Sequence, residues 1–251
     1  MVPSGSEYLG SWRDAPPQGD PPPHEKVANV ILVGVRGSRE SSSSPRDGMG
    51  STLSGVADRI ERRLARMQVR PERVGVRYPA SSLRYRSSRD AGVRSLAGTL
   101  RSALAGRPGT RFVLLGLSQG ADVVRAALQP GVLSPDMLRD LVAVVLLGDP
   151  GRDPRRDGAF QRGTPESAPG LLAKSAPPIP SGLWSRTWSY CLAGDHIAAS
   201  RRGTLGVLFS GTHTHYERNA ERVQDLAAEF ALGCLGTAIR QVRGSPDLFG
   251  G

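Results

Sequence analysis

The chain has 251 residues, of which 38% are hydrophobic and 22% are charged, and its formal charge is +10. This length allows one large domain with a sizeable core, and the lack of any run of about 18 apolar residues excludes a transmembrane helix. Two cysteines, Cys191 and Cys234, exclude a disulfide-dense scaffold and a four-cysteine zinc site. The basic residues are almost all arginines spread along the chain, so we expect a solvated basic surface and no nucleic-acid partner.

Residues 1–25 are rich in proline, glycine and serine, which predicts a flexible arm. They lack the basic and apolar regions of a secretory signal peptide. Five mostly apolar runs then have the composition of strands buried on both faces of a sheet: 27–35, 73–78, 111–117, 141–147 and 187–192.

Between these runs, apolar residues recur at spacings of three and four, which predicts amphipathic helices around 53–67, 93–104, 121–128 and 223–230. Strands that alternate with helices indicate an α/β fold with a parallel, doubly wound sheet. Residues 151–183 are expected to form a long loop over the carboxyl edge of the sheet, where such folds place their sites. We divide the chain into an arm (1–25), one α/β domain (26–240) and a tail (241–251).

The sequence Gly116-Leu117-Ser118-Gln119-Gly120 lies between a predicted strand and a predicted helix. A G-x-S-x-G in this context is typical of a nucleophilic serine on a sharp turn, where the glycines let strand and helix pack closely. The alternative is a tight turn in which Ser118 caps the helix. A nucleophilic serine also needs a base to take its proton and an acid to orient that base.

Three histidines follow Ser118. We favour His213 as the base because it lies in a segment rich in glycine and threonine just before the last helix. His215 in the same segment remains an alternative, whereas His196 directly follows Asp195 and is poorly placed to be oriented by it. His213 and His215 could be half of a metal site, but no nearby spacing completes one, so we expect no metal.

Asp149 and Asp195 each follow the end of a predicted strand. Asp195 is favoured as the acid because it follows the last strand and is nearer to His213. For Asp149 we prefer the role of a carboxylate that anchors a loop through backbone amides. An oxyanion hole needs preorganised donors, for which we expect the backbone N–H of Gln119 and a group from Ser38 in the turn after the first strand.

Several segments, in chain order, resemble the cutinase family of serine esterases, particularly its actinobacterial members. They include VRGSRE at 35–40, GMGSTLSGVADRIERRL at 48–64, GLSQGADVV at 116–124, GDP at 148–150, SYCLAGDHI at 189–197 and HTHY at 213–216. The resemblance implies a small α/β-hydrolase over residues 26–240, with a five-stranded parallel sheet and no true lid. It implies Ser118 as nucleophile, Asp195 as acid, His213 as base, Ser38 and Gln119 as oxyanion hole, and no cofactor.

The cysteines depart from the pattern of that family. Its members usually bridge the cysteine before the acid to one shortly after it, but Cys191 here is matched by Ala198. Cys191 could instead pair with Cys234. The family is usually extracellular, and the missing bridges and signal peptide leave the location open between that and a cytoplasmic enzyme released at lysis.

These features together predict a monomeric serine esterase that hydrolyses lipid-like, polyester or acyl esters through an acyl-enzyme. The first alternative is an esterase similar to the lysin B enzymes of actinobacterial phages, which would cleave the mycolyl ester of the cell envelope. The second is a degenerate binding protein that attaches to nucleic acid or an anionic envelope through its arginines. The Ser-Asp-His set argues against this last reading.

Overall fold

The computed structural model describes residues 29–38, 40, 47–107, 109–158, 168–199, 216 and 220–243. In this part of the chain, five parallel strands form one sheet in the order β2-β1-β3-β4-β5. The strands are β1 (Val30–Val35), β2 (Glu72–Gly75), β3 (Arg111–Leu117), β4 (Leu141–Leu147) and β5 (Thr187–Tyr190). The predicted five-stranded parallel sheet is therefore confirmed.

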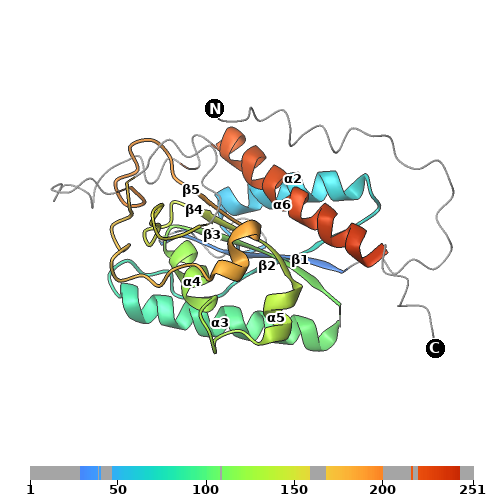
Figure 1. Cartoon of the computed structure of the whole chain (residues 1–251), viewed down its shortest axis with the longest axis horizontal. Helices are drawn as coiled ribbons and strands as arrows, with labels where there is room; N and C mark the ends of the chain where they lie inside the picture. The colour runs from blue at the N-terminus through green and yellow to red at the C-terminus, as the bar shows by residue number, and fades with distance from the viewer. Residues whose placement is uncertain are drawn as a thin grey trace.

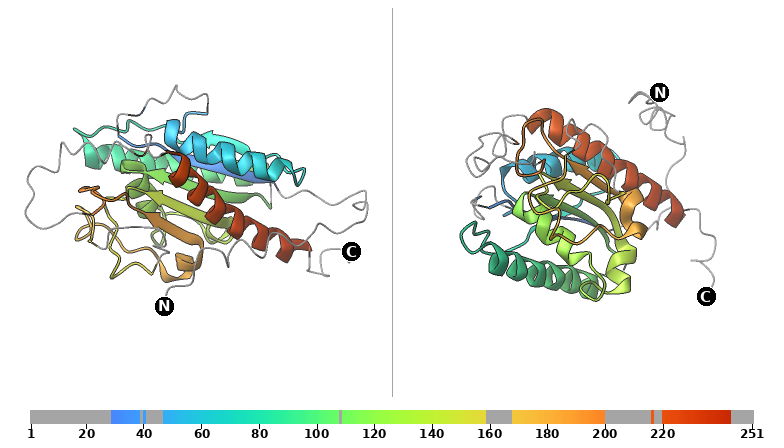
Figure 2. Two further views of the ribbon diagram at one scale, coloured as in Figure 1. Left: turned by 90° about the horizontal axis from the view of Figure 1, so that it is seen from above. Right: turned by 60° about the vertical axis from the view of Figure 1, so that its left-hand side comes forward.

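Helices cover both faces of the sheet (Figures 1 and 2). On one face lie α2 (Ser51–Ala65) and α6 (Ala220–Arg243), and on the other lie α3 (Tyr85–Gly106), α4 (Gln119–Ala127) and α5 (Pro135–Asp140). In β3, Val113 and Leu115 pack toward α2 and α6, whereas Phe112 and Leu114 pack toward α3 and α4. Since alternate residues meet different helix layers, each central strand must be apolar throughout.

The strand boundaries show where this apolar signal ends. β3 and β4 occupy the predicted ranges, because both are central and buried along nearly their whole length. β5 stops at Tyr190, two positions before the predicted end, because the backbone N–H of Leu192 donates to the Tyr216 hydroxyl at 3.1 Å. β2 is shorter than predicted, although Val76 still donates to the carbonyl of Gly34.

The helices differ more from the prediction. α3 begins at Tyr85 rather than near residue 93. Its first two turns are mostly polar, so the spacing of apolar residues did not predict them. The short α5 was not predicted, although Ser134 caps it and Pro135 opens it. A further short element, the 3₁₀ helix η1 (Ser181–Arg186), lies at the end of the predicted loop. α6 continues to Arg243, past the predicted domain boundary at residue 240.

The predicted arm of residues 1–25 lies outside the described residues, as does most of the predicted tail. Within the described part, none of the helices combines the length and the apolar character that crossing a membrane requires.

Candidate active site

Ser118 occupies a sharp turn between the end of β3 and the start of α4. Its backbone has φ 53° and ψ −118°, a combination that costs a residue with a side chain about 1–3 kcal/mol. Its N–H donates to the carbonyl of Leu147 at 2.9 Å, which ties the turn to the end of the neighbouring strand β4. The Ser118 side chain makes no capping hydrogen bond to α4, so the helix-cap alternative does not account for this residue.

The two glycines of the motif bring three backbone segments together. A Cβ atom on Gly120 would lie 1.9 Å from the carbonyl oxygen of Val35 at the end of β1. A Cβ atom on Gly116 would lie 2.8 Å from the Cα of Ala121. No real side chain fits at such distances, so glycine is needed where α4 begins against β1 and β3, as the sequence predicts.

Gln119 is the first residue of α4, so its backbone N–H is one of the four that no carbonyl of the helix can accept. Its side chain is fully buried. The amide nitrogen donates to the carbonyls of Ser81 (3.1 Å) and Tyr85 (3.3 Å), and the amide oxygen accepts from the Ser88 hydroxyl (3.3 Å). These bonds fix the start of α4 to the start of α3 and so hold the Gln119 backbone in place.

The turn after β1 is held by its own side chains. The N–H of Gly37 donates to the Glu40 carboxylate at 2.6 Å, and the Arg36 guanidinium donates to the carbonyls of Val76 (3.2 Å) and Tyr78 (2.5 Å). Because the N–H of Gly37 is used in this way, the half-buried Ser38 is the residue of the turn to consider as a donor to substrate. β1 and β3 are neighbours in the sheet, so this turn and the Ser118 turn leave the same edge.

Asp195 follows β5 and is completely buried. Its Oδ1 accepts from the backbone N–H groups of Ile197 and Ala198, each at 3.0 Å, and its Oδ2 accepts from the Tyr216 hydroxyl at 2.8 Å. Burial, followed by the nearby charge of Asp195, raises the pKa of Tyr216 well above its ordinary value near 10, so the hydroxyl stays protonated and can donate. These donors stabilise an ionised carboxylate in a fixed orientation.

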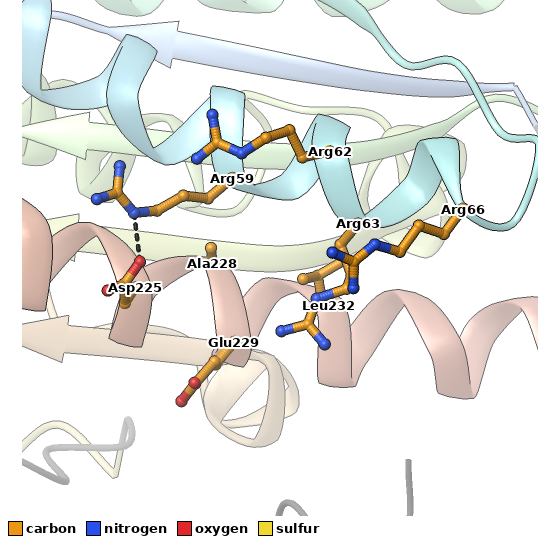
Figure 3. Close-up of a pocket in the computed structure, with 8 residues that line it drawn as sticks. All are labelled: Arg59, Arg62, Arg63, Arg66, Asp225, Ala228, Glu229 and Leu232. Atoms are coloured by element: carbon orange, nitrogen blue, oxygen red, sulfur yellow. Dashed lines mark hydrogen bonds and ion pairs between the residues drawn. The ribbon is translucent and has the colours of Figure 1, made fainter. Parts of the chain in front are cut away.

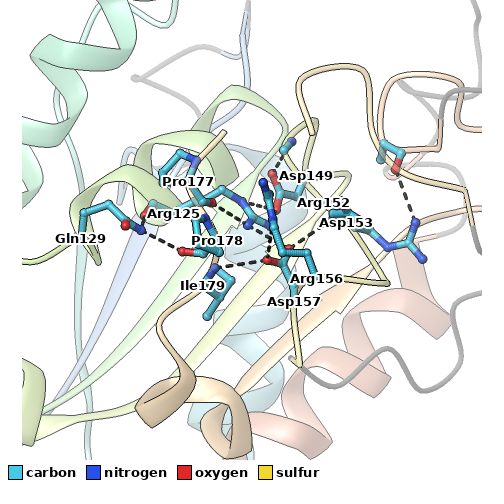
Figure 4. A network of polar contacts seen from close by, with 12 residues as sticks. Arg125, Gln129, Asp149, Arg152, Asp153, Arg156, Asp157, Pro177, Pro178 and Ile179 are labelled. Carbon is cyan, nitrogen blue, oxygen red and sulfur yellow. Dashed lines mark hydrogen bonds and ion pairs between the residues drawn. The ribbon is translucent and has the colours of Figure 1, made fainter. Parts of the chain in front are cut away.

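Asp149 has a different environment. Its Oδ1 accepts from the N–H of Gly151 at 2.8 Å, and its Oδ2 accepts from Arg125 of α4. Arg125 also pairs with Asp157 at 2.9 Å and donates to the carbonyl of Pro177 at 3.1 Å (Figure 4). Burial by itself lowers the pKa of Arg125, but the two carboxylates outweigh it and the net shift is upward. Asp149 thus anchors the loop after β4 to α4, in the role that we prefer for it.

The favoured base, His213, lies outside the described residues, and so does its alternative His215. His196 is described and is half-buried in the turn that follows Asp195. Among the described residues, no group of three or more His, Cys, Asp or Glu side chains is placed to hold a metal ion.

Both cysteines are thiols, so the possible bridge between Cys191 and Cys234 is not formed. Cys191 is buried against Ala198 and Ala199. Ala198 occupies the position at which the resembling family usually has the second cysteine, so apolar packing replaces a covalent link beside Asp195. Burial raises the pKa of the Cys234 thiol to about 11.

The sequence placed the candidate residues Ser118, Asp195, Ser38 and Gln119 at strand ends. It gave no role to Tyr216 and Arg125, which hold the surroundings of the site in place. Tyr216 is part of the HTHY segment at 213–216, and that segment was the signal that could have identified it. Arg125 gave no local signal, because its partners lie 24 and 32 residues away and only the fold brings them together.

Comparison with known proteins gives one family and several relatives. A family model described as Cutinase matches residues 26–233. The carboxylesterase Culp1 of Mycobacterium tuberculosis is 30% identical over 139 residues, which cover 54% of this chain and 58% of the relative. Culp1 of Mycobacterium bovis matches to the same extent. The chain thus spans little more than half the length of these curated relatives.

Solved structures share the fold. A cutinase-like protein from Cryptococcus sp. superposes with a TM-score of 0.69 at 23% identity, over 84% of this chain and 97% of that one. The catalytic core domain of acetyl xylan esterase from Trichoderma reesei gives a TM-score of 0.55 at 21% identity, over 80% and 100% of the two chains. These likenesses confirm the predicted small α/β-hydrolase architecture.

Proposed function

Because the chain belongs to the cutinase family, we propose that it is a carboxylic-ester hydrolase whose nucleophile is Ser118. The observation that carries this proposal is the strained turn of Ser118 at the end of β3, which is held by contacts with β1 and β4. Backbone strain of this kind persists only where the surrounding structure enforces it, and it is common at catalytic residues.

In the proposed reaction, the Ser118 oxygen attacks the ester carbonyl while His213 takes the hydroxyl proton. The tetrahedral intermediate collapses, His213 returns that proton to the departing alcohol, and an acyl-enzyme remains. Water, deprotonated by His213, then attacks the acyl-enzyme and releases the carboxylic acid and the free serine. The intermediate's oxyanion would be bound by the N–H of Gln119 and by Ser38, each donor contributing about 3 kcal/mol.

The surroundings of Asp195 support His213 as the base. Tyr216 bonds to Asp195, and position 213 is only three residues before Tyr216 in the chain. Three residues span at most about 11 Å, so a histidine at 213 is within reach of the acid that would orient it. The Asp195 carboxylate would stabilise the imidazolium form of His213 during each proton transfer.

For the substrate we propose acyl esters, including lipid-like or polyester substrates. The chain is similar to a carboxylesterase and shares its fold with a cutinase-like protein and with an acetyl xylan esterase. Two of these names are those of esterases, and only one of them specifies an acyl group, which is acetyl. A series of acyl lengths is therefore the informative assay.

The test is hydrolysis of p-nitrophenyl esters from acetate to palmitate by the wild type and by Ser118→Ala. We expect kcat/KM to fall by at least about a thousandfold in Ser118→Ala. The control is Ser175→Ala, which changes an exposed serine on the loop that precedes η1. A fluorophosphonate should label the wild type and Ser175→Ala at Ser118, and should not label Ser118→Ala.

Two results would contradict the proposal. Unchanged turnover in Ser118→Ala would show that another group is the nucleophile. Lack of both turnover and labelling in the folded wild type would favour the alternative of a degenerate binding protein. Labelling together with turnover of mycolyl-arabinogalactan alone would replace the broad ester specificity by the narrower envelope-ester reading.

A further inference from the structure

Three arginines of α2 and the arginine that caps its C-terminus line a groove of about 300 Å³ between α2 and α6. They are Arg59, Arg62, Arg63 and Arg66 (Figure 3). α6 contributes the remaining lining residues, which are Asp225, Ala228, Glu229 and Leu232. Four guanidinium groups therefore share one groove with two carboxylates, and the half-buried Leu232, beside the almost fully buried Ala228, makes part of its α6 side apolar.

The four arginines are not equivalent. Arg59 is bound to Asp225 and donates to the Gln224 side chain at 2.6 Å, so it joins the two helices. Arg62, Arg63 and Arg66 are exposed, and their guanidinium groups make no hydrogen bond or ion pair with any described residue. In Figure 3, Arg63 and Arg66 lie at the Leu232 end of the groove, away from the Arg59–Asp225 pair.

The crowding of these arginines destabilises the protein when nothing is bound in the groove. Arg62 and Arg66 are four residues apart on the helix and Arg63 and Arg66 are three apart, so their like charges repel. Basic groups near a helix C-terminus do interact favourably with its dipole, and α2 ends at Ala65. The interaction with the helix dipole, however, does not explain why these side chains line a groove against α6.

The guanidinium group is a planar fork that binds phosphate oxygens bidentately. We propose that the groove between α2 and α6 is a binding site for a phosphate group, held by Arg63 and Arg66, while Arg62, whose side chain points toward the Arg59 end in Figure 3, adds positive charge to the same groove. Ala228 and Leu232 lie beside the guanidinium groups and suit the organic part of a phosphate ester. The phosphate could come from a soluble ester or from a lipid headgroup, and the two sources share this chemistry.

The site is separate from the Ser118 edge. α2 starts after the turn that follows β1 and ends just before β2 begins, so Arg66 lies toward the amino-terminal edge of the parallel sheet. None of the lining residues belongs to the turns that carry Ser118, Ser38 or Asp195. Removing the groove arginines should therefore leave any ester turnover unchanged, which separates this proposal from the proposed function.

The experiment compares the full-length wild type with two triple variants of equal charge. R62Q/R63Q/R66Q removes the groove arginines, and R86Q/R94Q/R101Q removes three exposed arginines of α3 on the opposite side of the sheet. Binding of inorganic pyrophosphate is measured by calorimetry. Binding to phosphatidylcholine vesicles with and without phosphatidylglycerol is measured by sedimentation, with circular dichroism and thermal melting to verify folding.

We expect the groove variant to bind at least about tenfold more weakly than the wild type, and the α3 variant to stay within about twofold. Loss of pyrophosphate binding would indicate a soluble phosphate ester. Loss confined to phosphatidylglycerol vesicles would indicate a lipid headgroup. Equal weakening in both variants would mean that only net charge matters, and it would contradict the site. Unchanged binding in the groove variant would also contradict it, and so would a wild type that binds neither probe.

Discussion

The hydroxyl of Tyr216 takes part in two buried hydrogen bonds at once. It donates to Asp195 at 2.8 Å and accepts from the N–H of Leu192 at 3.1 Å. Tyr216→Phe keeps the ring and removes both bonds, leaving a buried N–H and a buried carboxylate oxygen short of a partner. We expect the free energy of unfolding, measured by urea denaturation, to fall by about 1–3 kcal/mol.

Tyr190→Phe is the matched control, because Tyr190 is also buried but its hydroxyl makes no hydrogen bond with the described residues. It should change stability by less than about 0.5 kcal/mol. If Asp195 orients the base as proposed, Tyr216→Phe should also lower kcat more than it raises KM. Equal stability losses in the two variants would mean that the Tyr216 bonds contribute little beyond ring packing.

At the scale of elements, two glycines in helices predict opposite effects of the same substitution. Gly120→Ala places a methyl group against the backbone oxygen of Val35, which cannot rotate away, and we expect a loss of about 2–3 kcal/mol in unfolding free energy. Gly98→Ala in α3 meets nothing within 4 Å, so it should stabilise the protein by up to about 1 kcal/mol because alanine favours helix.

Urea denaturation of both variants checks the signs. An unchanged unfolding free energy in Gly120→Ala would mean that α4 can move away from β1 without cost. The contact with β1 would then not enforce the strained turn of Ser118. A destabilising Gly98→Ala would contradict the open surroundings of that position in α3.

The same elements show how far sequence reasoning reaches. β3 and β4 could be predicted in full because burial on both faces leaves an unbroken apolar run. The short α5 and the polar start of α3 at Tyr85 could not, because neither has an apolar stripe long enough to detect. Ser118 and Asp195 were located because strand ends converge at one edge in parallel sheets. Tyr216 and Arg125 act through partners distant in sequence, which periodicity does not reveal.

At the scale of the whole molecule, the charge of +10 divides into structural and exposed parts. A solvated basic surface was expected, yet Arg36, Arg125 and Arg152 are buried. Arg125 is neutralised by Asp149 and Asp157, and Arg36 donates to backbone carbonyls. Composition therefore gives the sign of the surface potential but cannot tell which arginines hold the fold together and which face solvent, as in the groove of α2 and α6.

The tyrosines provide a prediction for the stability of the whole fold. The chain has five tyrosines, and four lie among the described residues: Tyr78, Tyr85, Tyr190 and Tyr216. Burial is the largest influence on each of these four and raises its pKa. In the unfolded chain a tyrosine loses its proton near pH 10, whereas the folded protein keeps these protons to higher pH.

Since the folded state retains protons that the unfolded state releases, the contribution of these tyrosines to stability is fully present below about pH 10 and falls above it. Each tyrosine held neutral contributes a slope of about 1.4 kcal/mol per pH unit. The buried Cys234 thiol, whose pKa rises to about 11, adds to the fall in the same direction. Urea denaturation between about pH 8 and pH 11 measures this dependence, and Tyr216→Phe should show a shallower fall than wild type. Two results would show that these hydroxyls reach water far more readily than their burial implies. One is an unfolding free energy that stays level over this pH range. The other is tyrosinate absorbance of the folded protein that rises near pH 10 for all of its tyrosines.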